Sequence, residues 1–377
     1  MEEIEFLQTL LRIDSSNPPG NEDAVARALQ ERAERAGLFV KQTAVAPQRS
    51  NVEVRLDGAS GPTLFLCGHM DTVTVGEGQW TYPAFSAERV GNRLYGRGAA
   101  DMKSGLAAMY LALESIREQG ITLPGEVVLL ATAGEEVDCC GAWTYVQEET
   151  MDHVDALVIG EPTNEKVVIG HKGAVWLEIT TYGKTAHGSM PEYGVNAVRH
   201  MLHIIELVEQ YALKWKRSQD VLGASSMAVT KIAGGVQTNV IPDRCSLHVD
   251  IRTVPPQQHA TLIAELRQRL NDYARQQEGL RISVKPLLDR PALLSEPSES
   301  IINTALSIKG QNEEDCYGVS YYTDGSVLNP KSAIPTLIYG PGDEKLAHQP
   351  DEWVDIEAYL RAIHFYKELV IRYLQVR

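Results

Sequence analysis

Hydrophobic residues recur along the chain with the spacings of helices and of buried strands. Near the start they return every three or four residues, which predicts a helix around Ile4–Leu11, and a second helix is expected over 21–37. Continuous apolar runs typical of buried strands follow, at 63–67, 126–132, 155–159 and 336–339. Further helical segments are expected over 105–119 and 356–374. Buried strands spaced by helices predict an α/β fold with a mostly parallel sheet covered by helices on both faces.

The middle of the chain instead alternates apolar and polar positions. Segments 175–182 and 245–251 follow this period of two, which indicates strands with one face in water. Amphipathic helices are expected over 196–215 and 260–277. We therefore expect residues 173–290 to form a smaller α+β domain, inserted into a catalytic domain made of residues 1–172 and 291–377.

Composition and charge narrow the classes of function. The 377 residues are 44% hydrophobic and 23% charged, and 35 Lys and Arg against 50 Asp and Glu give a net charge of −15. Such a surface repels nucleic acid and anionic membranes. The segment Met1–Glu5 is acidic where a secretory signal is basic, and no apolar stretch approaches the roughly 20 residues of a membrane helix. Five scattered cysteines fit free thiols, so we expect a cytoplasmic protein.

Candidate catalytic side chains stand where the apolar runs stop. In open α/β sheets the carboxyl ends of the strands form the ligand-binding crevice, so we expect these side chains to converge. Two of the residues are histidines and the others are carboxylates. In chain order they are His69, Asp71, Asp101, Glu135, Glu136, Glu161 and His348.

Imidazole and carboxylate together are the ligand set of zinc, cobalt or manganese. Two catalytic sites with three protein ligands each need six bonds, and five residues supply them if one carboxylate bridges. Two such ions can activate water and polarise a carbonyl oxygen. Asp71 would orient an imidazole, and Glu135 would carry a proton from the water to a leaving amine. Taken singly, a His-x-Asp pair is usually structural and a Glu-Glu pair usually solvated, but their joint occurrence favours a metal site.

These motifs resemble the zinc-dependent aminoacylase and carboxypeptidase family, which includes acetylornithine deacetylases, succinyl-diaminopimelate desuccinylases and related dipeptidases. The matching segments are 68–73, 96–105, 135–136, 160–162 and 348, and the resemblance covers nearly the whole chain. It implies that Glu135 is the general base and that the Asp101–Met102 peptide is cis. The metal assignments that it implies are one ion on His69 and Glu161, a second on Glu136 and His348, and Asp101 as the bridge.

The insert resembles the lid through which this family dimerises. Residues 185–191 match its histidine motif, which implies a homodimer in which His187 reaches into the partner's active site and stabilises the oxyanion. Residues 234–242 and 250–252 resemble the elements that hold a substrate carboxylate, here through Asn239 and Arg252. A simple pair with Asp250 is an equal alternative for Arg252. Gly340 either lines the pocket or forms a plain turn.

The substrate is less closely defined by the sequence. His171-Lys172-Gly173, at the entrance to the insert, is closer to acetylornithine deacetylases than to desuccinylases, although a plain hinge is the alternative. The adjacent Cys139 and Cys140 are expected to be buried hydrophobic residues. We expect a deacylase of N-acyl amino acids with two divalent ions, zinc first and cobalt or manganese as alternatives. The other interpretations are a dipeptidase or carboxypeptidase, a succinyl-diaminopimelate desuccinylase, and a metal-binding relative without catalysis.

Overall fold

The chain divides into two compact units in the computed structural model, which describes residues 1–375. Unit 1 comprises Met1–Gly170, Leu294–Tyr317 and Thr323–Arg377, and unit 2 comprises His171–Leu293 and Gly318–Tyr322. Unit 2 thus contains the segment that the sequence marks as an insert, together with a separate short piece. Within residues 1–375, no helix has both the length and the apolar character to span a membrane.

Unit 1 is built on a nine-stranded sheet in the order β1-β2-β6-β3-β7-β17-β8-β15, with β16 paired to β8. The four strands in the middle run parallel to one another and are buried along nearly their whole length, as expected for strands covered on both faces. They are β6 (Glu126–Thr132), β3 (Thr63–His69), β7 (Ala156–Ile159) and β17 (Thr336–Ile338). The α/β fold with a mostly parallel sheet is thereby confirmed.

Antiparallel strands flank this parallel centre on both sides. β1 and β2 form a hairpin beside β6, and β8 pairs with β17. The sequence patterns did not predict the hairpin. The bounds of the flanking strands are β1 (Phe39–Ala46), β2 (Arg49–Leu56), β8 (Val168–His171), β15 (Leu293–Leu294) and β16 (Tyr317–Val319).

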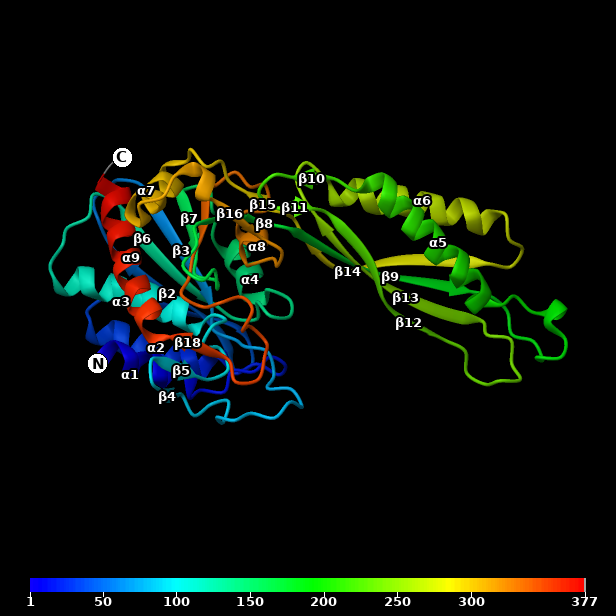
Figure 1. The fold of residues 1–377 in the computed structure, drawn as a ribbon, viewed down its shortest axis with the longest axis horizontal. Coiled ribbons are helices and arrows are strands. Elements are labelled where there is room, and N and C mark those ends of the chain that lie inside the picture. Colours follow the sequence, from blue (N-terminus) through cyan, green and yellow to red (C-terminus); the bar gives the residue numbers. More distant parts are fainter. Residues whose placement is uncertain (376–377) are drawn as a thin grey trace. The chain divides into compact units, whose positions relative to one another are not determined.

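Helices cover both faces of the sheet in unit 1 (Figure 1). α3 (Lys103–Glu118), α7 (Ser300–Lys309) and α9 (Ile356–Gln375) pack together on one face, and α4 (Cys140–Glu148) packs with the short α8 (Gly325–Leu328) on the other. α1 (Glu2–Leu11) contacts α3, while α2 (Glu22–Arg35) contacts β1 and β2. Leu7, Leu10 and Leu11 of α1 are fully buried, and Ile4 is half-buried, so the helix presents one apolar face to the core.

A small antiparallel sheet joins two segments of unit 1 that are distant in the sequence. It has the order β18-β5-β4, with β18 (Trp353–Asp355), β5 (Arg93–Tyr95) and β4 (Glu88–Val90). This sheet places the residues that follow His348 beside the residues that precede Asp101.

Unit 2 is a four-stranded antiparallel sheet with two helices on one face. Its order is β12 (Ser226–Gly234), β13 (Arg244–Thr253), β9 (Gly173–Tyr182) and β14 (Arg281–Arg290). α5 (Ala197–Trp215) and α6 (His259–Arg275) pack on the apolar face, where one residue in two is buried along β13. The Asn196 side chain caps α5 by accepting a hydrogen bond from the Arg199 N–H. A short hairpin, β10 (Ser218–Gln219) and β11 (Gly223–Ala224), completes the unit.

Close contact between α3 and the end of β7 requires a glycine. A Cβ atom at Gly105 would lie 1.9 Å from the carbonyl oxygen of Gly160, the residue before Glu161. We expect Gly105→Ala to lower the free energy of unfolding by about 1–3 kcal/mol, because the helix must move away from the sheet. Denaturant unfolding measures this, with Glu118→Ala on the exposed end of the same helix as a control expected within about 0.5 kcal/mol of wild type. Equal unfolding midpoints for Gly105→Ala and wild type would contradict the prediction.

Candidate metal centre

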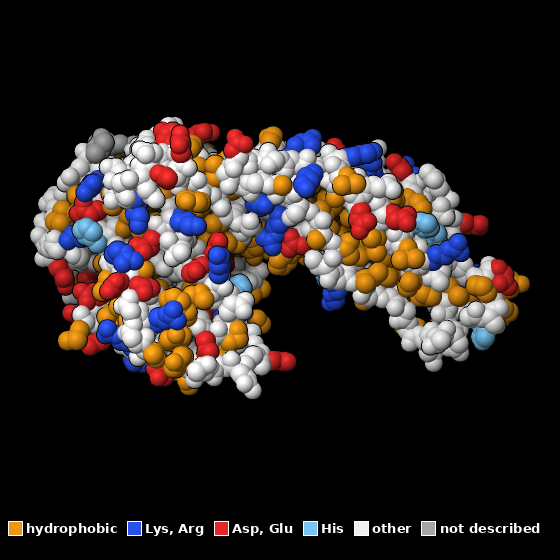
Figure 2. All heavy atoms as spheres, viewed as in Figure 1, with side chains coloured by type: hydrophobic (Ala, Val, Ile, Leu, Met, Phe, Trp, Pro, Cys, Tyr) orange, Lys and Arg blue, Asp and Glu red, His pale blue; other side chains and the backbone are white. Residues whose placement is uncertain are grey.

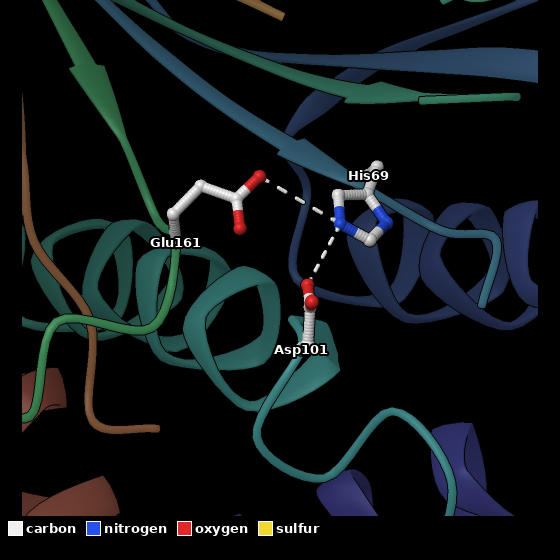
Figure 3. A group of neighbouring side chains, drawn as sticks. All are labelled: His69, Asp101 and Glu161. Atoms are coloured by element: carbon white, nitrogen blue, oxygen red, sulfur yellow. Dashed lines mark hydrogen bonds and ion pairs between the residues drawn. The ribbon is translucent and has the colours of Figure 1, made fainter. Parts of the chain in front are cut away.

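Two carboxylates from separate loops of unit 1 converge on one histidine nitrogen. His69 is the last residue of β3, Asp101 precedes α3 by two residues, and Glu161 follows β7 by two. His69 Nε2 lies 3.1 Å from Asp101 Oδ1 and 3.7 Å from Glu161 Oε1. Figure 3 shows both carboxylates directed toward this nitrogen. The parallel strands thus bring together residues more than thirty positions apart.

A second group shares Asp101 with the first. The other carboxylate oxygen of this residue, Oδ2, lies 3.4 Å from His348 Nε2, which is also 3.1 Å from Glu136 Oε2. In each group of three, one potential ligand atom per residue lies within 4.8 Å of the others. Asp101 therefore presents one oxygen to each group, the arrangement that a bridging ligand requires. The peptide bond Asp101–Met102 is cis.

Buried negative charge at this centre exceeds what nearby hydrogen-bond donors satisfy. Glu135 and Glu161 are only 7% and 4% exposed. Burial raises the pKa of both carboxyls and that of Glu136, and the charge of Asp101 raises the pKa of Glu136 and Glu161 further. The Oε1 atoms of Glu135 and Glu136 are buried without a hydrogen-bond partner among residues 1–375. Divalent cations satisfy such oxygens, so the side chains fit two metal ions.

The two histidines hold protons when no ion is bound. Burial opposes a charged His69, but its hydrogen bond to Asp101 and the charge of Glu161 outweigh burial and raise its pKa well above the usual value. Hydrogen bonds to Asp101 and Glu136 raise the pKa of His348 to about 10. Burial pulls the pKa of Asp101 upward, yet the hydrogen bonds from both imidazoles hold it below its usual range. Protonated imidazoles therefore balance part of the carboxylate charge.

Asp71 connects the histidine to the Glu135–Glu136 turn. His69 Nδ1 lies 2.9 Å from the main-chain oxygen of Asp71 and 3.6 Å from its carboxylate. The carboxylate instead accepts the N–H groups of Glu135 (3.1 Å) and Glu136 (3.2 Å), and an amide N–H of Asn17 (2.9 Å). Asp71 thus orients the imidazole mainly through its backbone, and its side chain fixes the backbone of the two glutamates.

His348 has an unfavourable backbone conformation. Its φ is 66°, in the left-handed region that non-glycine residues rarely adopt. Such a residue costs about 1–3 kcal/mol and persists only where the surrounding structure enforces it. The His348 side chain contacts Glu136 and Asp101, and the carbonyl of the next residue, Gln349, accepts a hydrogen bond from Arg97 Nη1 at 3.2 Å.

Two buried carboxylates near the centre are not among the site residues predicted from the sequence. Asp324 Oδ2 accepts a hydrogen bond from Thr132 Oγ1 at 2.6 Å, and burial raises the pKa of Asp324 to about 6. Glu352 is 1% exposed and accepts hydrogen bonds from the segment that carries Asp101. The only sequence signal for Glu352 is its position four residues after His348.

His187 and Asn239 lie together in unit 2. A β-bridge joins His187 to Val240, and the Gly188 N–H donates to the Asn239 carbonyl at 2.7 Å. His187 is exposed, with Nδ1 2.7 Å from the Ser189 hydroxyl oxygen. Both predicted side chains are therefore on neighbouring loops at the surface of this unit.

Arg252 is paired within its own strand. Its Nε and Nη2 donate to the two oxygens of Asp250 at 2.8 and 3.1 Å, and Asp250 also accepts the Trp176 indole N–H. His171 is fully buried, and burial lowers its pKa to about 4, so it is neutral. Lys172 Nζ donates to the Ala224 carbonyl at 2.6 Å.

Gly340 lies in unit 1 against the backbone of Glu161. Its N–H donates to the Thr163 hydroxyl, and its carbonyl accepts the Glu165 N–H. A Cβ at this position would lie 2.4 Å from the Glu161 carbonyl oxygen, so the close approach requires glycine.

No disulfide joins the five cysteines within residues 1–375. Cys139 is buried as expected, but Cys140 is only half-buried, which corrects the expectation for that residue. Burial raises the pKa of Cys140 to about 12, which keeps the thiol protonated at neutral pH.

Comparison with known proteins identifies the family. Residues 65–372 match the model of peptidase family M20/M25/M40, and the chain therefore belongs to this family. It is 32% identical to a probable succinyl-diaminopimelate desuccinylase of Staphylococcus aureus (strain MSSA476), over 99% of this chain and 98% of that protein. It is also 32% identical to an acetylornithine deacetylase of Aliivibrio salmonicida (strain LFI1238), over 90% and 89% of the two chains.

A solved structure supports the same fold. The M20 family metallo-carboxypeptidase Sso-CP2 from Sulfolobus solfataricus is similar over the whole length of both chains, with a TM-score of 0.81 and 21% identity. Family, fold and relatives together make this protein a metal-dependent amidohydrolase.

Metal binding at this centre should release protons. The ligand form of histidine is the neutral imidazole, whereas the raised pKa values keep His69 and His348 protonated at pH 7. We expect about two protons to be released as both ions bind, and the apparent affinity to rise with pH up to about 10. Calorimetry in buffers of different ionisation enthalpy counts the protons.

Two variants serve as controls in this measurement. His348→Ala should release about one proton fewer than wild type. His364→Gln, on the exposed side of α9, should leave the count unchanged. Binding heats that do not depend on the buffer would contradict the protonated-imidazole arrangement.

Proposed function

We propose that the protein hydrolyses the amide bond of an N-acyl amino acid and releases a carboxylate and a free amine. The observation that carries this proposal is the pair of ligand groups sharing Asp101, with a buried oxygen of Glu135 beside them that has no hydrogen-bond partner among residues 1–375. Both curated relatives are named for the removal of an acyl group, which favours a deacylase over a peptidase.

In this proposal the five clustered side chains hold two divalent ions. His69 and Glu161 would hold one ion, Glu136 and His348 the other, and Asp101 both. When bound, the ions supply positive charge that polarises the amide carbonyl and makes water acidic enough to lose a proton near neutral pH. Zinc suits the mixed imidazole and carboxylate donors best, and cobalt or manganese accept the same set.

Glu135 would move the proton. Burial raises its pKa, so its carboxylate is a stronger base than an exposed glutamate. It takes a proton from the attacking water and returns it to the amide nitrogen as the carbon–nitrogen bond breaks. Asp71 holds the Glu135 N–H, which keeps the side chain in one place through both transfers.

A desuccinylase is the second candidate, and one observation in unit 2 favours it. Burial, and after it the charge of Arg252, lowers the pKa of Lys172, so two cationic side chains lie within electrostatic reach of each other. A pair of cations suits a substrate with a second carboxylate. A dipeptidase or carboxypeptidase would use the same centre with a longer leaving amine.

We also propose a homodimer formed through unit 2. β12 is at one end of its sheet and almost every residue in it is exposed, which leaves a free strand edge. Leu202, Leu213, Ile232 and Val236 are each more than half exposed, and Figure 2 shows hydrophobic side chains gathered over this unit. A second subunit would cover this surface and accept His187 into its active site. The free thiols favour the cytoplasm.

The proposal predicts amine release from acylated amino acids in a substrate panel. N-acetyl-ornithine, N-succinyl-diaminopimelate, other N-acetyl amino acids and dipeptides would be tested with zinc-loaded or cobalt-loaded protein, before and after chelation. We expect chelator-sensitive release from at least one N-acyl amino acid. Amine release from dipeptides alone would establish the peptidase. If no substrate of the panel released an amine while two ions were bound, hydrolysis of these substrates would be refuted.

Glu135→Gln separates the general base from metal binding in the same assay. We expect kcat to fall by about 10²–10⁴-fold with two ions still bound, because the amide cannot accept the proton. Glu118→Gln, on the exposed end of α3, is the matched control and should keep full activity. Undiminished turnover in Glu135→Gln would remove Glu135 from the mechanism.

Mixed dimers test the role of His187. We expect His187→Ala to lose about 10²–10³-fold in kcat, since the oxyanion loses a donor. Mixing it with the inactive Glu135→Gln should restore up to about one quarter of wild-type activity, because half of the dimers contain one complete site. If the mixture shows only the summed activity of the two parents, His187 does not act across a dimer.

A further inference from the structure

The carboxylate of Glu352 is buried beneath the loop that carries Asp101. Glu352 Oε1 accepts the N–H groups of Ala100 (2.8 Å) and Asp101 (3.0 Å), and Oε2 accepts that of Gly98 (3.1 Å). Arg97 Nη1 donates to Oε2 at 2.6 Å. One side chain therefore receives four hydrogen bonds from four residues of a single loop.

Arg97 extends this contact to two other segments. Its side chain is 2% exposed and lies over the ring of Trp80, 5.1 Å from the ring centre. Nη1 also donates to the Gln349 carbonyl at 3.2 Å, and Nη2 donates to the Thr74 carbonyl at 3.3 Å. Gln349 follows His348 directly, and Thr74 belongs to the segment that leaves β3 after His69.

The segment from His348 to Glu352 needs such an anchor. Both His348 and Asp351 have positive φ values, 66° and 53°. The Asp351 carboxylate accepts the N–H groups of Thr81 (2.7 Å) and Tyr82 (3.2 Å), and β18 begins directly after Glu352. Contacts therefore fix this strained stretch at both of its ends.

We infer that Glu352 is a positioning residue of the metal centre, which acts with Arg97 to hold the segments that carry His69, Asp101 and His348 in one geometry. Its own oxygens are occupied by four donors, so it does not itself bind an ion. Both acceptor oxygens are necessary, because a glutamine would turn an NH₂ group toward buried N–H donors and leave at least one of them unsatisfied. The inference rests on the proposed function, in which the three held residues bind metal.

The test compares Glu352→Gln with a matched ion pair elsewhere in unit 1. Glu114 on α3 pairs with Arg32 through hydrogen bonds of 2.7 to 3.1 Å and is 8% exposed, but no metal-centre residue contacts this pair in the hydrogen bonds described. Both Glu352→Gln and Glu114→Gln should lower the unfolding midpoint of the metal-free protein. Only Glu352→Gln should also weaken zinc binding, by about 10–100-fold in competition with a chelator.

Kinetics and spectroscopy distinguish positioning from general destabilisation. With saturating metal, Glu352→Gln should lower kcat while KM stays near wild type, and the visible absorption spectrum of the cobalt form should change. Glu114→Gln should match wild type in both. If Glu352→Gln binds zinc and turns over as wild type does, or if both variants lose affinity in parallel with stability, the inference is wrong.

The same proteins also distinguish a variant that fails to fold from a failure of the proposed function. If Glu352→Gln fails to fold, Glu352→Asp replaces it. That variant keeps the carboxylate but is one methylene too short to reach all four donors. Unchanged zinc affinity in Glu352→Asp would also refute the inference. A wild-type protein that binds none of zinc, cobalt and manganese would overturn the proposed function itself, whatever the variants do.

Discussion

Repulsion among buried carboxylates at the carboxyl edge of the parallel sheet is the constraint on which the rest of the structure depends. Ionised carboxylates cost several kcal/mol each to bury without a partner. Six carboxylates gather here: Asp71, Glu135, Glu161 and Asp324 are buried, and Asp101 and Glu136 are partly buried. Two protonated histidines balance only part of that charge, and the raised pKa values of the three glutamates show the remainder. Divalent ions would supply the positive charge that the cluster lacks, and their binding explains why the fold retains it.

The hydrophobic core holds these carboxylates close together in spite of their electrostatic repulsion. β6, β3, β7 and β17 are neighbours although they are far apart in sequence, and each ends in the same region with a short loop. Because the strands are buried on both faces, their ends cannot drift to relieve the repulsion. Gly105 lets α3 approach the end of β7, and Gly340 lets its own loop approach Glu161. Rigid packing of the strands therefore keeps the like-charged carboxylates close together when no ion is bound.

The sequence predicted the layers of this arrangement better than their connections. Continuous apolar runs identified β3, β6, β7 and β17, and the alternation along β13 identified the antiparallel sheet of unit 2. The β1–β2 hairpin was missed, because β1 is largely exposed and its pattern is weak. Glu352 was missed for another reason: its partners are main-chain N–H groups about 250 positions away, and such contacts leave no periodic trace in a sequence.

Hydrogen bonding distinguishes the carboxylates that support this centre from those that face the ions. Asp71 accepts three donors and Glu352 accepts four, so both oxygens of each carboxylate are already engaged in hydrogen bonds. Glu136, by contrast, keeps one buried oxygen without a partner among residues 1–375. Glu135 combines both features, because Asp71 fixes its N–H while its own Oε1 is free within the same residues. A carboxylate fixed by its backbone and free at its side chain is suited to carry a proton rather than to bind an ion.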